Sequence, residues 1–149
     1  MPLRKLIFLS SLVLAVAALG PAAALGAAKG TDRPLSGTNT ATVIINLATQ
    51  TGTVDGTGQL SHFGKFTFHG DITLTGTTET YVAANGDKMF TTVVTTGGAG
   101  VDTITGGTGR FADASGTFTV FHDPPVTVSV VGLIFTATGT STYEGQISY

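Results

Sequence analysis

Apolar and polar residues alternate along most of the chain beyond residue 39, a pattern that predicts half-buried β-strands. The alternation is clearest over 65–75 (KFTFHGDITLT), where one face is apolar and the other is rich in threonine. In that segment the apolar face carries Phe66, Phe68, Ile72 and Leu74. The segment 41–48 is patterned in the same way. Both segments therefore predict strands with one buried face.

Turn signals separate about eight such segments. Asn85-Gly86 predicts a hairpin turn, Asp55-Gly56 predicts another turn, and Gly132 predicts a bend or bulge. No part of 40–149 carries a helical stripe of useful length. Many strands with short connections predict a sandwich or a closed barrel, and glycines inside the strands suit the corners of a small barrel.

Residues 1–24 have the pattern of a signal peptide. Arg4 and Lys5 precede an apolar run over 6–19, and small residues follow it. A bilayer needs about 20 apolar residues to be spanned, so this run is too short for a stable membrane anchor. We expect cleavage after Ala24, and hence a secreted or periplasmic protein.

A second small-residue site would move the cleavage to residue 28. The polar residues 25–39, which include glycine and proline, are predicted to form a flexible leader. The folded domain is then expected over 40–149.

Charge is sparse in the predicted domain. The chain has 7 Lys and Arg residues against 9 Asp and Glu residues, and cleavage would remove Arg4 and Lys5. The resulting acidic domain has no basic patch, so we expect no nucleic-acid partner. The chain has no cysteine, so the core must stabilise the fold without disulfides. An exposed β-branched surface could serve a homo-oligomer interface.

The most distinctive motif lies over 105–117 (TGGTGRFADASGT). A phosphate loop would need Lys and then Ser or Thr after the last glycine, but Arg110 and Phe111 follow instead. A calcium nonapeptide repeat would need Asp in place of Phe111, and tandem copies. We therefore interpret the motif as structural: a tight turn, Phe111 in the core and a helical turn over 110–115.

The run GTGRFADASG also resembles the signature of the allene oxide cyclase barrel-like superfamily, to which the dirigent-like β-barrels are related. The segments 61–66, 83–87 and 139–149 extend the resemblance across 40–149. It implies a small closed antiparallel β-barrel of about eight strands. It also implies a central cavity, in which family members cyclise reactive lipids or polyenes or orient radical coupling. The family's catalytic positions do not map onto a motif of this chain.

Three residues are candidates for acid–base chemistry. Glu79 and Tyr81 share one face of a predicted strand, and an inward orientation would bury the carboxyl group and raise its pKa. An outward orientation would make Glu79 a solubilising charge. His62 is the third candidate, although a structural hydrogen bond is the simpler role. His69 and Asp71 could reach one metal, but their threonine-rich face suggests a solvated exterior, so we expect no metal site.

The candidate ligand-binding residues are aromatic: Phe66, Phe68, Phe90 and Phe111. They could form the core or line a cavity, because ligand pockets are mostly apolar. We predict that the barrel binds a small apolar ligand in its lumen without a cofactor. A cyclase or isomerase acting by substrate confinement is the first alternative. A structural surface protein with a filled barrel is the second.

Overall fold

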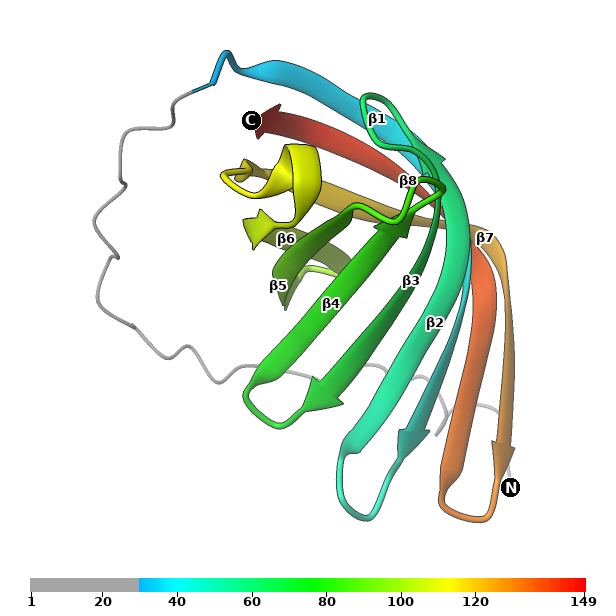
Figure 1. Cartoon of the computed structure of the whole chain (residues 1–149). Helices are drawn as coiled ribbons and strands as arrows, with labels where there is room; N and C mark the ends of the chain where they lie inside the picture. The colour runs from blue at the N-terminus through cyan, green and yellow to red at the C-terminus, as the bar shows by residue number, and fades with distance from the viewer. Residues whose placement is uncertain (1–29) are drawn as a thin grey trace.

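The computed structural model describes residues 30–149, and the predicted signal peptide with its cleavage sites lies outside the described residues. Eight antiparallel strands close into a barrel in the order β1 to β8, which confirms the predicted fold class (Figure 1). The strands are β1 (Arg33–Asn46), β2 (Thr51–Leu60), β3 (Gly64–Thr73), β4 (Gly76–Ala83), β5 (Lys88–Thr96), β6 (Ala99–Gly107), β7 (Ser115–Val131) and β8 (Ile134–Ser148). A short 3₁₀ helix, η3 (Gly109–Phe111), joins β6 to β7. No helix among residues 30–149 is long and apolar enough to cross a membrane.

Pairing of β1 with β8 closes the barrel. Following directly paired residues once around the barrel leads from Val43 back to Arg33, a stagger of ten residues along β1. Such a stagger tilts the strands and sets the width of an eight-stranded barrel, whose interior side chains can fill or one small ligand can occupy.

The structure corrects two of the predicted boundaries. Residues 33–39, assigned above to a flexible leader, form the first half of β1 and pair with the end of β8. Asp55-Gly56 is not a turn, since both residues lie inside β2. The turns at Asn85-Gly86 and at Gly132 are confirmed, and both glycines have positive φ.

Two glycines of β2 make room for aromatic rings of β3. Gly56 pairs with Phe68, and Gly58 pairs with Phe66. A Cβ at Gly56 would lie 2.3 Å from the Phe68 ring, and one at Gly58 would lie 2.7 Å from the Phe66 ring. The rings thus cover the bare backbone of β2, a known means of building curved sheets.

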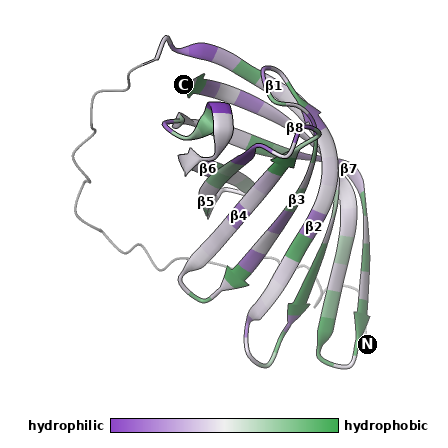
Figure 2. Cartoon of the chain, viewed as in Figure 1, coloured by the Kyte–Doolittle hydropathy of each residue, from purple (hydrophilic) through white to green (hydrophobic). Residues whose placement is uncertain are grey.

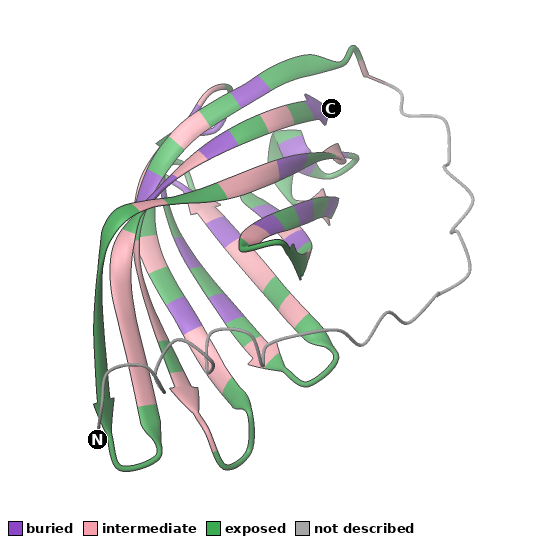
Figure 3. Cartoon of the chain, turned by 180° about the vertical axis from the view of Figure 1, so that it is seen from behind, coloured by how far each residue is buried: buried purple, intermediate pink, exposed green. Residues whose placement is uncertain are grey.

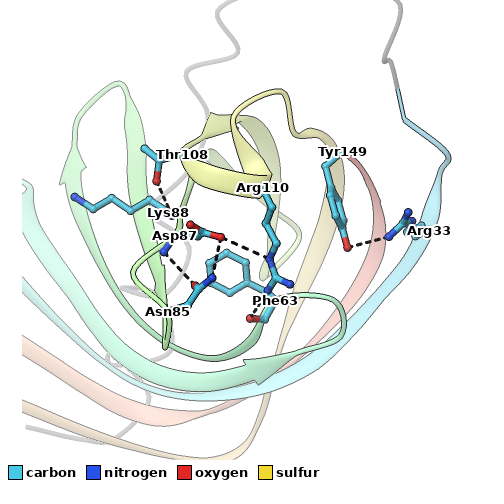
Figure 4. A network of polar contacts seen from close by, with 8 residues as sticks. All are labelled: Arg33, Phe63, Asn85, Asp87, Lys88, Thr108, Arg110 and Tyr149. Atoms are coloured by element: carbon cyan, nitrogen blue, oxygen red, sulfur yellow. Dashed lines mark hydrogen bonds and ion pairs between the residues drawn. The ribbon is translucent and has the colours of Figure 1, made fainter.

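One end of the barrel is capped by η3 and the loops around it. Phe111 is fully buried, as predicted, and its ring packs 4.7 Å from that of Phe63. Arg110 donates a hydrogen bond to the Phe63 carbonyl at 3.3 Å and lies 3.8 Å from Asp87 (Figure 4). Beside it, Thr108 accepts a bond from the Lys88 backbone. These contacts hold the distinctive motif in a structural role.

The other end of the barrel is flared. β6 pairs with β7 only as far as Val120, and from there β7 continues beside β8 alone to Val131. The β1–β2, β3–β4 and β7–β8 hairpins project from this end, opposite to η3 (Figure 1). Apolar residues lie near the free end of β7 and β8 (Figure 2), yet the hairpin tips are exposed (Figure 3). The flared end therefore presents apolar residues to solvent.

Candidate functional site

Glu79 and Tyr81 both point into the barrel, which settles the orientation left open by the sequence. Tyr81 is 1% exposed, and its hydroxyl donates a 2.7 Å hydrogen bond to Oε2 of Glu79. Glu79 pairs with Gly70 of β3, where a Cβ would lie only 2.7 Å from Cγ of Glu79. The glycine of β3 therefore makes the space that the carboxylic side chain occupies.

A second carboxyl group, which the sequence analysis missed, lies beside the first. Asp102 of β6 is 1% exposed, and its Oδ1 accepts a 2.8 Å hydrogen bond from Thr91. The alternation over 101–105 puts Asp102 on the face of Ile104, which is also buried. The alternation could have identified Asp102 as a residue on the same face as Ile104, but it does not indicate which face points into the barrel.

Burial dominates the electrostatics of this carboxyl pair. Burial, and then the nearby charge of Glu79, raise the pKa of Asp102 to about 8. Burial also raises the pKa of Glu79, against the opposing effect of hydrogen bonds from Tyr81 and Asp102. Because both carboxyl groups lie in an apolar interior, the pair retains a proton at neutral pH. They form a pair able to donate or accept one.

Further polar groups continue from the carboxyl pair across the barrel. Asn39 of β1 donates a 2.5 Å hydrogen bond from Nδ2 to the hydroxyl of Tyr143. Burial raises the pKa of both Tyr81 and Tyr143, so both phenols stay protonated. Among the described residues, Oδ1 of Asn39 and Oδ2 of Asp102 are buried and have no hydrogen-bonding partner.

Aromatic rings fill the barrel at the level of these polar groups and toward the capped end. The ring of Tyr81 stacks on Phe68 at 5.2 Å, and lies 5.3 Å from Phe66 and 6.1 Å from Phe118. Phe118 in turn contacts Tyr143 at 5.5 Å. The middle of the barrel is thus packed by its own side chains, and any lumenal ligand must sit nearer the flared end.

The four aromatic candidates for ligand binding separate in space. Phe66 and Phe68 belong to the packed middle, and Phe111 belongs to the cap. Phe90 does not point inward: the buried Met89 and Thr91 on either side of it take the inner positions of β5. None of the four lines the flared end.

The flared end has an apolar lining that extends outward from the carboxyl pair. Val43, Ile72 and Val120 are half-buried and pack against the core. Farther out, Val128 and Val130 pair with Ala137 and Phe135 of β8, and each valine is 54% exposed. We call this inner surface, including Ile45 of β1, the apolar flare.

Glycine opens the floor of the apolar flare toward Asp102. Gly100 pairs with Val120 and faces inward two residues before Asp102. A Cβ at Gly100 would lie 4.0 Å from Oδ2 of Asp102 and no closer than 3.4 Å to any side chain. The carboxyl pair is therefore the polar floor of the flare.

The histidine candidates lie away from this floor. His62 is in the turn between β2 and β3, where Nε2 is 3.1 Å from the carbonyl oxygen of Pro34. That contact supports the structural role. His122 lies on the inner face of β7 beside Ser141, with Nδ1 3.0 Å from its hydroxyl.

His69 lies on the outside of the barrel, as its threonine-rich face suggested. Its side chain is 55% exposed, with Nδ1 2.7 Å from Asp55 and Nε2 3.7 Å from Asp71. The hydrogen bond with Asp55 is the main cause that raises the pKa of His69. An open hollow of about 580 Å³ beside it is lined mainly by threonines and residues such as Asp55.

Residues 30–149 contain no group of three or more His, Cys, Asp or Glu that could hold a metal ion.

The geometry thus combines an apolar flare with a floor of two carboxyl groups, an arrangement suited to holding an apolar molecule and to moving a proton at one end of it.

Comparisons of the chain with models of protein families, with curated proteins and with solved structures found no match.

Proposed function

We propose that this protein is an exported barrel of the allene oxide cyclase-like type that binds a small apolar molecule in the apolar flare. The body of the molecule lies against the valines of β7 and the facing residues of β1 and β8. Its inner end reaches the floor formed by Glu79 and Asp102. The export part of the proposal rests on the signal-peptide pattern of residues 1–24.

The exposure of the inner face of β7 carries the proposal. Val128 and Val130 lie on the face that is buried elsewhere in the barrel, whereas Thr127 and Ser129 lie on the outer face. Alternation of this kind specifies an apolar surface for burial. Both valines are 54% exposed, so the surface lacks a cover. The concave side of a barrel mouth suits a small apolar molecule.

The packed middle of the barrel limits where the ligand can lie. Phe68, Tyr81 and Phe118 occupy the space at the level of the carboxyl pair. The filled-barrel alternative therefore describes this middle layer, and the ligand-binding reading concerns the flare alone.

Val128→Asp is expected to weaken binding of an apolar fluorescent probe about tenfold or more, because it puts a charge into the apolar contact. The matched control is Ser129→Asp, which adds the same charge to the outer face of the same strand. The measurement is titration of each purified variant with the probe, with native mass spectrometry to detect any ligand carried through purification. Equal affinities in the two variants would place the probe outside the flare and contradict the proposal.

The carboxyl pair favours a second function, cyclisation or isomerisation of a reactive polyunsaturated lipid. Burial raises the pKa of both Glu79 and Asp102 at the floor of the flare, so the pair could protonate or deprotonate the inner end of a confined substrate. Incubation with a lipid epoxide should then change the stereochemical composition of the products from that of the spontaneous reaction. Glu79→Gln should restore the spontaneous composition. Identical products with and without the wild-type protein would leave binding as the function.

A further inference from the structure

The barrel interior around Glu79 and Asp102 holds no Lys or Arg side chain, and His122 lies on the inner face of β7 nearer the flared end. Glu79 and Asp102 lie on either side of Thr91, which pairs with Glu79 and donates a hydrogen bond to Asp102. The Lys and Arg side chains of residues 30–149 are all exposed: Arg33, Lys65, Lys88 and Arg110. No Lys or Arg of residues 30–149 therefore faces the pair, and any negative charge that it keeps is buried without such a counter-ion. An isolated charge in an apolar interior is strongly unfavourable.

Unused hydrogen-bond acceptors accompany this charge. Oδ2 of Asp102 accepts no bond from an N–H or O–H group of residues 30–149, although the residue is only 1% exposed. The same holds for Oδ1 of Asn39, an uncharged side chain that is 6% exposed and donates a hydrogen bond to Tyr143. Buried acceptors without donors are rare in folded proteins. The polar groups at the floor therefore include hydrogen-bond acceptors that lack donors.

Oδ2 of Asp102 lies one inward position deeper than Gly100, on the side of the barrel that leads to the flare. Gly100 provides no side chain above Oδ2 of Asp102, and a Cβ there would meet its neighbours only at ordinary contact distances. An elongated molecule lying against Val120 and Val128 would bring its inner end to this point. The polar end of the molecule would then meet the carboxyl oxygens of the floor.

From these observations we infer that the ligand of the flare is an apolar molecule with a protonated amine at its inner end, held by Glu79 and Asp102. The ammonium group supplies the missing positive charge and up to three donors. This inference rests on the proposed function, because it names the chemical class bound at the same site. A carboxylate end is excluded by repulsion, and a hydroxyl end supplies a donor but no charge.

Three probes of equal chain length test the head group: decylammonium, decanol and decanoate, each below its micelle concentration. Displacement of an apolar fluorescent probe from the purified protein gives their affinities. We expect decylammonium to bind about tenfold or more tightly than decanol, which corresponds to one charge-assisted hydrogen bond. Decanoate should bind most weakly.

Variants separate the floor from the acidic surface. Asp102→Asn and Glu79→Gln should each reduce the preference for the ammonium probe over decanol by about tenfold. Two variants are used so that one folding failure does not remove the test. Asp55→Asn, on the exposed outer hollow, should keep the preference.

The outcomes distinguish the two proposals. Equal binding of all three probes, or tightest binding of decanoate, would overturn the amine inference and leave the apolar site standing. Loss of the preference in Asp55→Asn would also overturn the inference, because it would move the amine to the outer surface. Binding of no probe would overturn the proposed function and the inference with it.

Discussion

Asp102→Asn is expected to raise the free energy of unfolding at pH 8 by about 3 kcal/mol and to change it little at pH 4. The asparagine keeps the shape of the side chain and can still accept the hydrogen bond of Thr91. It removes a carboxyl group whose pKa is raised by burial to about 8 in the folded protein. Few single substitutions of a buried polar residue should stabilise, which makes this result diagnostic.

The pH dependence follows from the direction of that shift. Well below its ordinary pKa of 3.8, the carboxyl group is protonated in both the folded and the unfolded chain, so it contributes no difference. Between pH 4 and pH 8 the unfolded chain releases the proton and the folded chain retains it, so the wild-type protein loses stability as the pH rises. The raised pKa of Glu79 acts in the same direction.

Urea unfolding of wild type and variant at several pH values between 4 and 9 measures this effect. The control is Asp113→Asn, an exposed carboxylate whose removal should leave the pH profile as in wild type. A variant profile parallel to that of the wild type would mean that Asp102 ionises freely in the folded protein. The carboxyl pair would then not be a buried proton-sharing site.

Gly58→Ala is expected to destabilise the protein by about 3 kcal/mol. The new methyl group would lie 2.3 Å from the carbonyl oxygen of Thr38 and 2.7 Å from the ring of Phe66. Movement of the ring could relieve the second clash, but the first involves backbone held by the β1–β2 ladder. The strand or its aromatic cover must shift, and either shift disturbs the packed middle of the barrel.

Gly100→Ala is the matched comparison, since it is also an inward-facing glycine inside a strand. Its methyl group would meet nothing closer than 3.4 Å, so the change should alter stability by less than about 1 kcal/mol. Thermal or urea unfolding of the two variants tests the difference. Equal losses would mean that strand glycines matter through backbone flexibility alone, and not through the space they leave for the rings.

Period-two alternation was enough to predict the barrel, because inward residues such as Phe66 and Phe68 lie in continuous strands. The turn signal of Asp55-Gly56 was misleading, because Gly56 pairs with strands on both sides of β2 and Phe68 covers it. Residues 33–39 were not predicted as a strand, because their sequence does not alternate; they form a strand by pairing with β8. In both cases distant contacts override local preference.

The site was only half predictable for the same reason. Glu79 and Tyr81 were recognised as a pair on one strand, but which side faced inward depended on register with β3 and β5. Phe90 was assigned to the binding residues because it is aromatic, whereas the smaller Thr91 and the flexible Met89 take the inner positions. Asp102 lies on β6, and the pairing of β4, β5 and β6 brings it close to Glu79 across Thr91.

Closure by β1 and β8 also governs when the chain can fold. The first strand finds one of its two partners only after β8 has been synthesised, and that ladder joins residues 88 to 114 positions apart. Loop closure over such a distance is slow, and it cannot occur while the C-terminal strand is still in the ribosome. Until β8 is available, the sheet of β1 to β7 stays open along the edge of β1.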